Sequence, residues 1–136
     1  MTVIADTGAL YALIDASDTW HARVLEWWQS NSSPVVVPVT VVPELTWLLQ
    51  TRIGPDAEAA FIRAVVDGEF TIEQLEAADI VRGAELLERY ADLPLGFTDA
   101  SIVAVAERFE AREILTTDRR HFGVVQPRRG RFVLVP

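Results

Sequence analysis

The chain has 136 residues, of which 50% are hydrophobic and 24% are charged, a balance typical of one globular domain with one core and not of a disordered segment. Cysteine and lysine are both absent, which excludes disulfides, thiolate metal sites and reactions that need a side-chain amine. The net charge of −8 argues at first against a nucleic-acid partner, whose phosphates attract basic surfaces.

The N-terminal segment lacks the basic region of a secretory signal and reaches the acidic Asp6 early. No apolar run in the chain approaches the roughly 18 residues that a membrane-spanning helix needs. We therefore expect a cytoplasmic protein that does not contact a membrane.

Apolar runs and amphipathic segments follow one another along the chain and predict strands and helices in alternation. In chain order, the expected elements are a strand over residues 2–6, helices over 8–15 and 17–31, a strand over 35–38, helices over 41–54 and 56–68, a strand over 69–75, helices over 76–91 and 99–111, and strands over 113–118 and 131–136. Thr7, Asp18 and Thr98 are the expected N-caps of three helices, and Thr40 opens a fourth. Strands that alternate with helices predict an α/β sandwich around a mostly parallel sheet.

Four carboxylates occupy matching positions in this scheme. Asp6 and Asp118 end strands, whereas Glu44 and Asp99 lie in the first turns of helices that follow connecting loops. In an open α/β sheet, the carboxyl ends of the strands and the helix N-termini that follow them share one edge, where ligands bind. Carboxylates that converge there repel one another unless a cation neutralises them. Oxygen ligands favour Mg²⁺ or Mn²⁺, and such an ion indicates hydrolysis of phosphodiester bonds.

Each of these acids also has a structural explanation when it is considered alone. Asp99 would interact with the helix macrodipole, and Glu44 would simply be solvated. Asp6 would form a turn, and Asp118 would make a surface ion pair with the arginines that follow it. Because the four acids occur together at equivalent ends of elements, we favour a common site.

The histidines and tryptophans are expected to have structural roles. His21 lies on a helix with tryptophans and is expected to be packed or at the surface and not catalytic. His121 follows the run TTDRR; we expect a structural or solvated role for it, with contact to a phosphate as the alternative. The four tryptophans are expected mostly in the core. However, the adjacent Trp27 and Trp28 cannot both face the same way on a helix, which leaves one of them for a partner interface.

Four stretches of the sequence together resemble the PIN-domain family, and within it the small VapC-type toxins. They are VIADTGALYALID at the N-terminus, PVTVVPELTWLL around Glu44, ADLPLGFTDASIVAVAER around Asp99, and ILTTDRRHF around Asp118. The resemblance covers nearly the whole chain and matches in order, spacing and local context. It implies a single PIN-like domain over residues 1–136 with an α/β/α sandwich, and a toxin ribonuclease that depends on Mg²⁺ or Mn²⁺.

The same resemblance assigns the catalytic roles to four acids, Asp6, Glu44, Asp99 and Asp118. The metal ligands that it implies are Asp6, Asp99 and Asp118. Glu44 would act through a bound water or orient the nucleophile, and a hydroxyl of Thr7 or Thr117 would add a contact behind the ligands.

The resemblance also implies macromolecular partners. Toxins of this family dimerise and are inhibited by a cognate antitoxin that binds across the active-site groove. We therefore expect a homodimer and an antitoxin, with a partner surface on the helices that carry Trp27, Trp28 and Trp47.

Basic residues for an RNA substrate are concentrated near the C-terminus. From residue 112 onward, six arginines stand against Glu113 and Asp118, a local net charge of +4, and the remainder of the chain carries −12. Arg112, Arg119 and Arg120 are the candidate contacts to the RNA backbone.

Two other functions are compatible with the acids. A phosphoryl-receiver domain also gathers carboxylates and Mg²⁺ at the carboxyl edge of a parallel sheet. Such a domain relies on neighbouring acids after the first strand and on a lysine after a late strand, whereas this chain has Asp6 alone and no lysine. The other alternative is a non-catalytic PIN-like interaction module, in which the same acids bind a structural ion or none.

Overall fold

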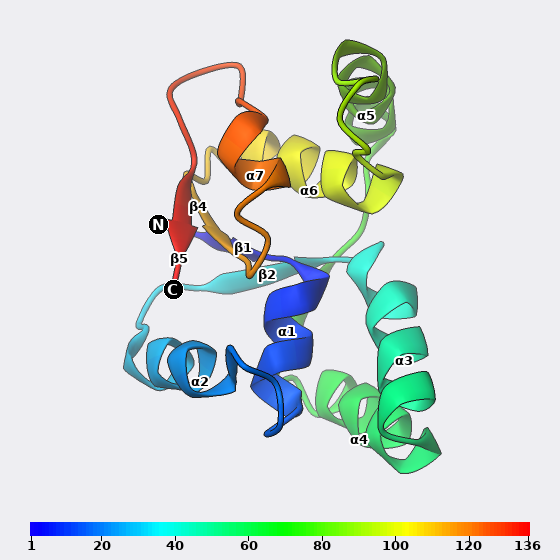
Figure 1. Cartoon of the computed structure of the whole chain (residues 1–136). Helices are drawn as coiled ribbons and strands as arrows, with labels where there is room; N and C mark the ends of the chain where they lie inside the picture. The colour runs from blue at the N-terminus through cyan, green and yellow to red at the C-terminus, as the bar shows by residue number, and fades with distance from the viewer.

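The computed structural model describes residues 1–136 and places five parallel strands in one sheet, in the order β3-β2-β1-β4-β5. The strands are β1 (Val3–Ala5), β2 (Val35–Pro38), β3 (Thr71–Glu73), β4 (Glu113–Leu115) and β5 (Val133–Val135). The helices are α1 (Thr7–Ile14), α2 (His21–Ser30), α3 (Val41–Arg52), α4 (Pro55–Val66), α5 (Ala77–Arg89), α6 (Phe97–Arg108) and α7 (His121–Val124). Helices α1 to α4 lie on one side of the sheet and α5 to α7 on the other (Figure 1), which confirms the expected α/β/α sandwich.

The sheet is parallel throughout, and not only mostly parallel, because every connection between successive strands contains a helix and returns the chain to the same edge. The register places Ile4 of β1 opposite Val36 of β2 and Ile114 of β4. All residues of β1 are fully buried, because helices cover both faces of the sheet. This burial explains why the strand is a continuous apolar run in the sequence.

The structure confirms the five predicted strands and the six predicted helices, with ends that differ by a few residues. It adds α7, which has four residues and is too short to show a hydrophobic period.

Three predicted helix caps are wrong, those at Thr7, Asp18 and Thr98. Thr7 is the first residue of α1, and its N–H donates to Asp6 Oδ1 at 2.7 Å, so that Asp6 is the N-cap. Helix α2 begins only at His21, because Asp18 accepts the N–H of Trp20 at 2.8 Å and closes a turn ahead of the helix.

The starts of α3 and α6 also differ in detail from the prediction. Helix α6 begins at Phe97 with Gly96 as its N-cap, so Thr98 lies inside the first turn and is not the cap. Thr40 is the N-cap residue of α3, as expected. Its hydroxyl lies 2.6 Å from the Ser101 hydroxyl of α6 and does not bond to its own helix.

Helix α6 is the most deeply buried helix, with an unbroken run of buried residues over 100–106. It packs against α5 on one side and against β1 and β2 on the other. Trp27 and Trp28 pack against the core, whereas Trp47 is 62% exposed and contradicts the expectation of a core position. None of the seven helices combines the length and apolar composition that crossing a bilayer requires.

Candidate active site

The four predicted acids lie at the carboxyl edge of the sheet. Asp6 directly follows β1, and Asp118 lies shortly after β4. Glu44 and Asp99 lie in the first turns of α3 and α6. The parallel topology places these strand and helix ends at one edge of the molecule.

Asp6 is only 5% exposed. Its Oδ1 accepts the N–H of Thr7 at 2.7 Å, and its Oδ2 accepts the hydroxyl of Thr116 at 2.8 Å. Burial, and after it the negative charge of Asp99, raise the pKa of Asp6 to about 7, although the two hydrogen bonds favour the ionised form. Near neutral pH, this carboxyl group therefore ionises fully only when a cation lies beside it.

Thr116 connects Asp6 to Asp118. The Thr116 hydroxyl donates to Asp6 Oδ2 and accepts the N–H of Asp118 at 2.8 Å. The role of Thr116 was not predicted from the sequence, which indicated Thr7 or Thr117 as the source of a hydroxyl contact. The Thr7 hydroxyl is buried and has no hydrogen-bond partner. The available signal was the spacing, because a threonine hydroxyl commonly bonds to the backbone two residues further along a turn.

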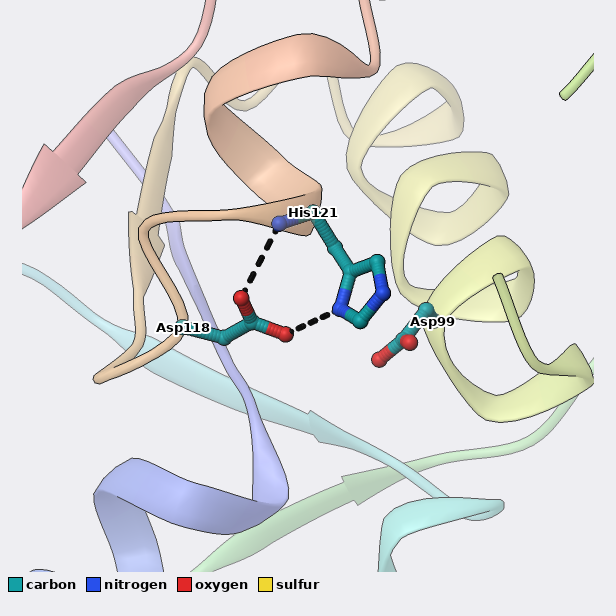
Figure 2. Close-up of side chains that lie close together, drawn as sticks. All are labelled: Asp99, Asp118 and His121. Carbon is teal, nitrogen blue, oxygen red and sulfur yellow. Dashed lines mark hydrogen bonds and ion pairs between the residues drawn. The ribbon is translucent and has the colours of Figure 1, made fainter. Parts of the chain in front are cut away.

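Asp118 organises the loop after β4 and the start of α7. Its Oδ1 accepts the N–H groups of Arg120 and His121 at 3.0 and 2.9 Å, and its Oδ2 lies 2.5 Å from Nδ1 of His121 (Figure 2). Burial acts to raise the pKa of Asp118, but the hydrogen bonds and the charge of His121 outweigh it, and the pKa is lowered. Asp118 is therefore ionised at neutral pH.

Asp99 faces His121 and Asp118 from α6. Burial raises the pKa of Asp99 to about 6; the charge of His121 opposes this shift, and the charges of Asp118 and Glu44 add to it. Ligand atoms of Asp99, Asp118 and His121 all lie within 4.8 Å of one another. Figure 2 shows the imidazole between the two carboxylates.

The place of His121 in this cluster was missed in the sequence, where the residue was expected to be structural or solvated. The signal that could have identified it is its position three residues after Asp118, at the start of a helix. An Asp that precedes a helix accepts backbone N–H groups two or three residues further on, which brings it beside the first helical residue. The sequence indicated no such helix, because α7 is so short.

Glu44 is the exposed acid of the four. Two hydroxyl groups fix its helix relative to α6, because Thr40 Oγ1 lies 2.6 Å from Ser101 Oγ, which in turn donates to the carbonyl oxygen of Thr98 at 2.7 Å. Since the Ser101 hydrogen is used on Thr98, the hydrogen between the two hydroxyls belongs to Thr40. This bridge holds the first turns of α3 and α6, and thus Glu44 and Asp99, side by side.

The three arginines that we expected to contact RNA lie in different places. Arg112 immediately precedes β4 and is at the opposite edge of the sheet from Asp118. Arg119 donates to two carbonyl groups at the C-terminal end of the chain, at 3.2 and 2.6 Å, and thereby fixes β5. Arg120 is exposed directly beside Asp118, which makes it the arginine of the three that is both near the site and free to contact a ligand.

The donor groups of this site fit a divalent cation. Asp99 and Asp118 supply carboxylate oxygens close to a ring nitrogen of His121, and Nε2 of His121 is buried without a hydrogen-bond partner. Asp6 is not part of this three-residue cluster but adjoins it through Thr116. The cluster thus differs from the expected ligand set by containing His121 in place of Asp6.

Comparison of the sequence with known proteins relates the chain to one protein family. Residues 3–126 match the family model of the PIN domain. Over 135 residues, the chain is 41% identical to Ribonuclease VapC26 of Mycobacterium tuberculosis (strain ATCC 25618 / H37Rv), a match that covers 98% of this chain and 100% of the relative.

Solved structures show the same fold. VapC20 of Mycobacterium tuberculosis, described as a sarcin–ricin loop cleaving toxin, superposes with a TM-score of 0.81 at 24% identity, over 87% of this chain and 91% of that chain. VapBC of Salmonella typhimurium bound to DNA superposes with a TM-score of 0.73 at 15% identity, over 98% of both chains.

Proposed function

Because the chain belongs to the PIN-domain family and is a homologue of the VapC ribonucleases, we propose that it is a metal-dependent endoribonuclease and the toxin of a toxin–antitoxin pair. The reaction is the hydrolysis of RNA phosphodiester bonds at the site of Asp6, Glu44, Asp99 and Asp118. One observation carries the proposal within this chain: ligand atoms of Asp99, Asp118 and His121 lie within 4.8 Å of one another, close enough for these side chains to hold a metal ion.

In this proposal the cofactor is Mg²⁺ or Mn²⁺, and Asp6, Asp99 and Asp118 hold it. When bound, such an ion lowers the pKa of a water and stabilises negative charge on the phosphate. Glu44, the exposed acid, accepts a hydrogen bond from the attacking water and orients it toward phosphorus. Thr116 keeps Asp6 and Asp118 in fixed positions through its two hydrogen bonds.

RNA binding has to overcome the net charge of −8. We propose Arg120 as the contact to the backbone phosphates, because it is exposed and adjoins Asp118. An interaction through so few cations predicts a modest dependence of RNA affinity on salt.

The structural relatives include a toxin–antitoxin complex from Klebsiella pneumoniae, and we propose that this chain also binds a cognate antitoxin and forms a homodimer. The exposed Trp47 on α3 is a candidate contact for one of these partners. We further propose that residues 1–136 act as a single domain in the cytoplasm. The match to the PIN domain over residues 3–126 argues against a phosphoryl-receiver domain.

The reaction class can be tested with a mixed RNA pool. The purified protein is incubated with RNA and Mg²⁺, Mn²⁺ or a chelator, and the new RNA ends are mapped. We expect cutting with metal, none with chelator, and recovery when metal is added back. Metal binding without any cutting would instead support the non-catalytic module.

The site assignment can be tested with Asp99→Asn. The amide keeps the shape but removes the charge, so we expect metal-dependent cleavage to fall by more than about 100-fold. The fold should be retained, since burial already disfavours the ionised form of Asp99. Asp92→Asn is the matched control, because Asp92 is an exposed acid in the loop before α6. Cleavage by Asp99→Asn at the rate of this control would refute the assignment.

A further inference from the structure

The imidazole of His121 lies between the carboxylates of Asp99 and Asp118 (Figure 2), but it has no role in the proposed reaction. Its Nδ1 lies 2.5 Å from Oδ2 of Asp118. The other oxygen of this carboxylate, Oδ1, accepts the backbone N–H groups of Arg120 and His121, so the carboxylate acts as a hydrogen-bond acceptor in this turn. Nδ1 therefore carries the hydrogen and donates it. The other ring nitrogen, Nε2, is then left to bind a proton or a metal ion.

No protein group forms a hydrogen bond with Nε2. Nε2 of His121 is buried and has no hydrogen-bond partner, although the side chain as a whole is 19% exposed. A buried polar atom without a hydrogen-bond partner costs about 1–3 kcal/mol, so an atom of this kind requires an explanation. The neighbouring carboxylate of Asp99 forms no hydrogen bond to it.

A cation between Asp99 and His121 would satisfy both groups. A ring nitrogen of His121 and a carboxylate oxygen of Asp99 lie within 4.8 Å of each other, and an ion with bonds of about 2.1 Å can span such a separation after a small side-chain adjustment. The bond to Asp118 supports the same conclusion. Histidines that bind metals almost always donate their other ring N–H to a carboxylate, a carbonyl or a water, which fixes the tautomer and the ring orientation.

We propose that His121 is a direct ligand of the catalytic metal through Nε2, in a mixed nitrogen and oxygen site with Asp99. Asp118 then contributes its negative charge to the site and also holds the imidazole of His121 in the tautomer that binds metal through Nε2. The inference rests on the metal-dependent nuclease proposed above and specifies the class of its cofactor.

A nitrogen ligand changes which ion the site prefers. Mg²⁺ favours oxygen ligands in near-ideal octahedral geometry, whereas imidazole suits transition metals. A site made only of carboxylates would discriminate little between Mg²⁺ and Mn²⁺. With His121 as a ligand, the site binds Mn²⁺ more tightly than Mg²⁺, and the difference depends on this one side chain.

The direct test is pulsed electron paramagnetic resonance of the full chain loaded with Mn²⁺, because a bound imidazole gives a ¹⁴N modulation that carboxylates and water do not. The chain contains two histidines, so the assignment needs one pair of variants. His121→Asn can keep a hydrogen bond to Asp118 but lacks the distal nitrogen. His21→Asn is the matched control, since His21 is on α2 and its Nδ1 bonds to the Ala12 carbonyl oxygen at 2.7 Å.

We expect the ¹⁴N modulation in the wild type and in His21→Asn, and its loss in His121→Asn. Calorimetric titration should show that His121→Asn weakens Mn²⁺ binding by about tenfold or more and changes Mg²⁺ binding much less. Mn²⁺ bound with no ¹⁴N modulation, or a modulation that persists in His121→Asn, would overturn the inference.

These results also separate the inference from the proposed function. If metal supports cleavage but no nitrogen coupling appears, the nuclease stands and His121 is not a ligand. If neither Mn²⁺ nor Mg²⁺ binds and chelator has no effect on cleavage, the metal-dependent nuclease is wrong, and the inference about His121 fails with it.

Discussion

At the scale of single residues, hydroxyl groups hold the acids of this site in place. Thr116 bonds to both Asp6 and Asp118 through one oxygen atom. The pair of Thr40 and Ser101 joins the two helices that carry the other two acids. Short hydroxyl side chains suit this purpose, because they can donate and accept at once in a space too small for another charged group.

Replacement of Thr116 by valine tests this view. Thr116→Val keeps the shape of the side chain but leaves Asp6 Oδ2 and the N–H of Asp118 without partners. We expect the free energy of unfolding to fall by about 1–3 kcal/mol and the cleavage rate to fall about tenfold or more. Urea denaturation and initial rates measure the two effects. Thr116→Ser retains the hydroxyl and should restore both; equal stabilities for the two variants would show that the bridge contributes little.

The four acids could be predicted from the sequence, but the groups that support them could not. Asp6, Glu44, Asp99 and Asp118 each stand at the end of an element, so a correct alternation of strands and helices was enough to bring them together. The roles of Thr116 and His121 depend instead on the path of one short loop after β4. No periodic pattern describes that loop.

At the scale of elements, α6 is the main support of the site. It lies between α5 and the sheet, and its N-terminal turn carries Asp99. Its other end is fixed by Arg108, which forms ion pairs with Glu73, Glu76 and Asp79 at 3.1, 3.4 and 3.0 Å. These acids belong to the end of β3 and the start of α5, so one arginine joins three elements.

Loss of this arginine should destabilise the protein without changing the site. In Arg108→Met, the carboxylate of Asp79, which is 3% exposed, is left buried and unpaired, so we expect a loss of about 3–5 kcal/mol in the free energy of unfolding. Metal affinity should be unchanged, because Arg108 is about 13 Å along the helix from Asp99. Thermal denaturation and metal titration measure the two properties.

Arg63→Met provides the comparison for this prediction, since Arg63 is exposed on α4 and should tolerate the same replacement with little change. A similar small effect at Arg108 would show that the ion pairs at the end of α6 are not important for stability.

The elements could be predicted because the central strands β1, β2 and β4 are short apolar runs that are mostly buried, and because the longer segments between strands have the composition and length of helices. The predicted helix starts were less accurate. Ser, Thr and Asp are frequent in the chain, and each can either cap a helix or form a turn just ahead of it. Asp18 forms a turn ahead of α2, where the sequence suggested a helix cap. Only the three-dimensional path of the chain distinguishes these two roles.

At the scale of the whole molecule, the acids of the site act against the stability of the metal-free fold. Asp6 and Asp99 have pKa values of about 7 and about 6, raised from an ordinary value of 3.8. The folded state therefore binds more protons than the unfolded state between these values. The free energy of unfolding contributed by the two groups then falls as the pH rises from about 4 to about 7.

This effect can be isolated with Asp6→Asn, which removes the titrating group. At pH 4 the wild type and the variant should have similar stability. At pH 8, without metal, the variant should be more stable by up to about 4 kcal/mol, the equivalent of a shift of about three pKa units. Urea denaturation across this pH range in chelator measures the difference. A difference that does not change with pH would contradict the raised pKa of Asp6.

The bonds that Asp118 makes to α7 affect how mutagenesis of the site has to be interpreted. One carboxylate accepts two backbone N–H groups and bonds to the side chain of His121, and the helix that it opens has only four residues. So short a helix has little stability of its own. Activity lost in Asp118→Ala would thus combine the removal of a charge with the unwinding of the segment that carries His121. Asp99 lies in a twelve-residue helix that is packed on both sides, so its variants report on the chemistry of the site alone.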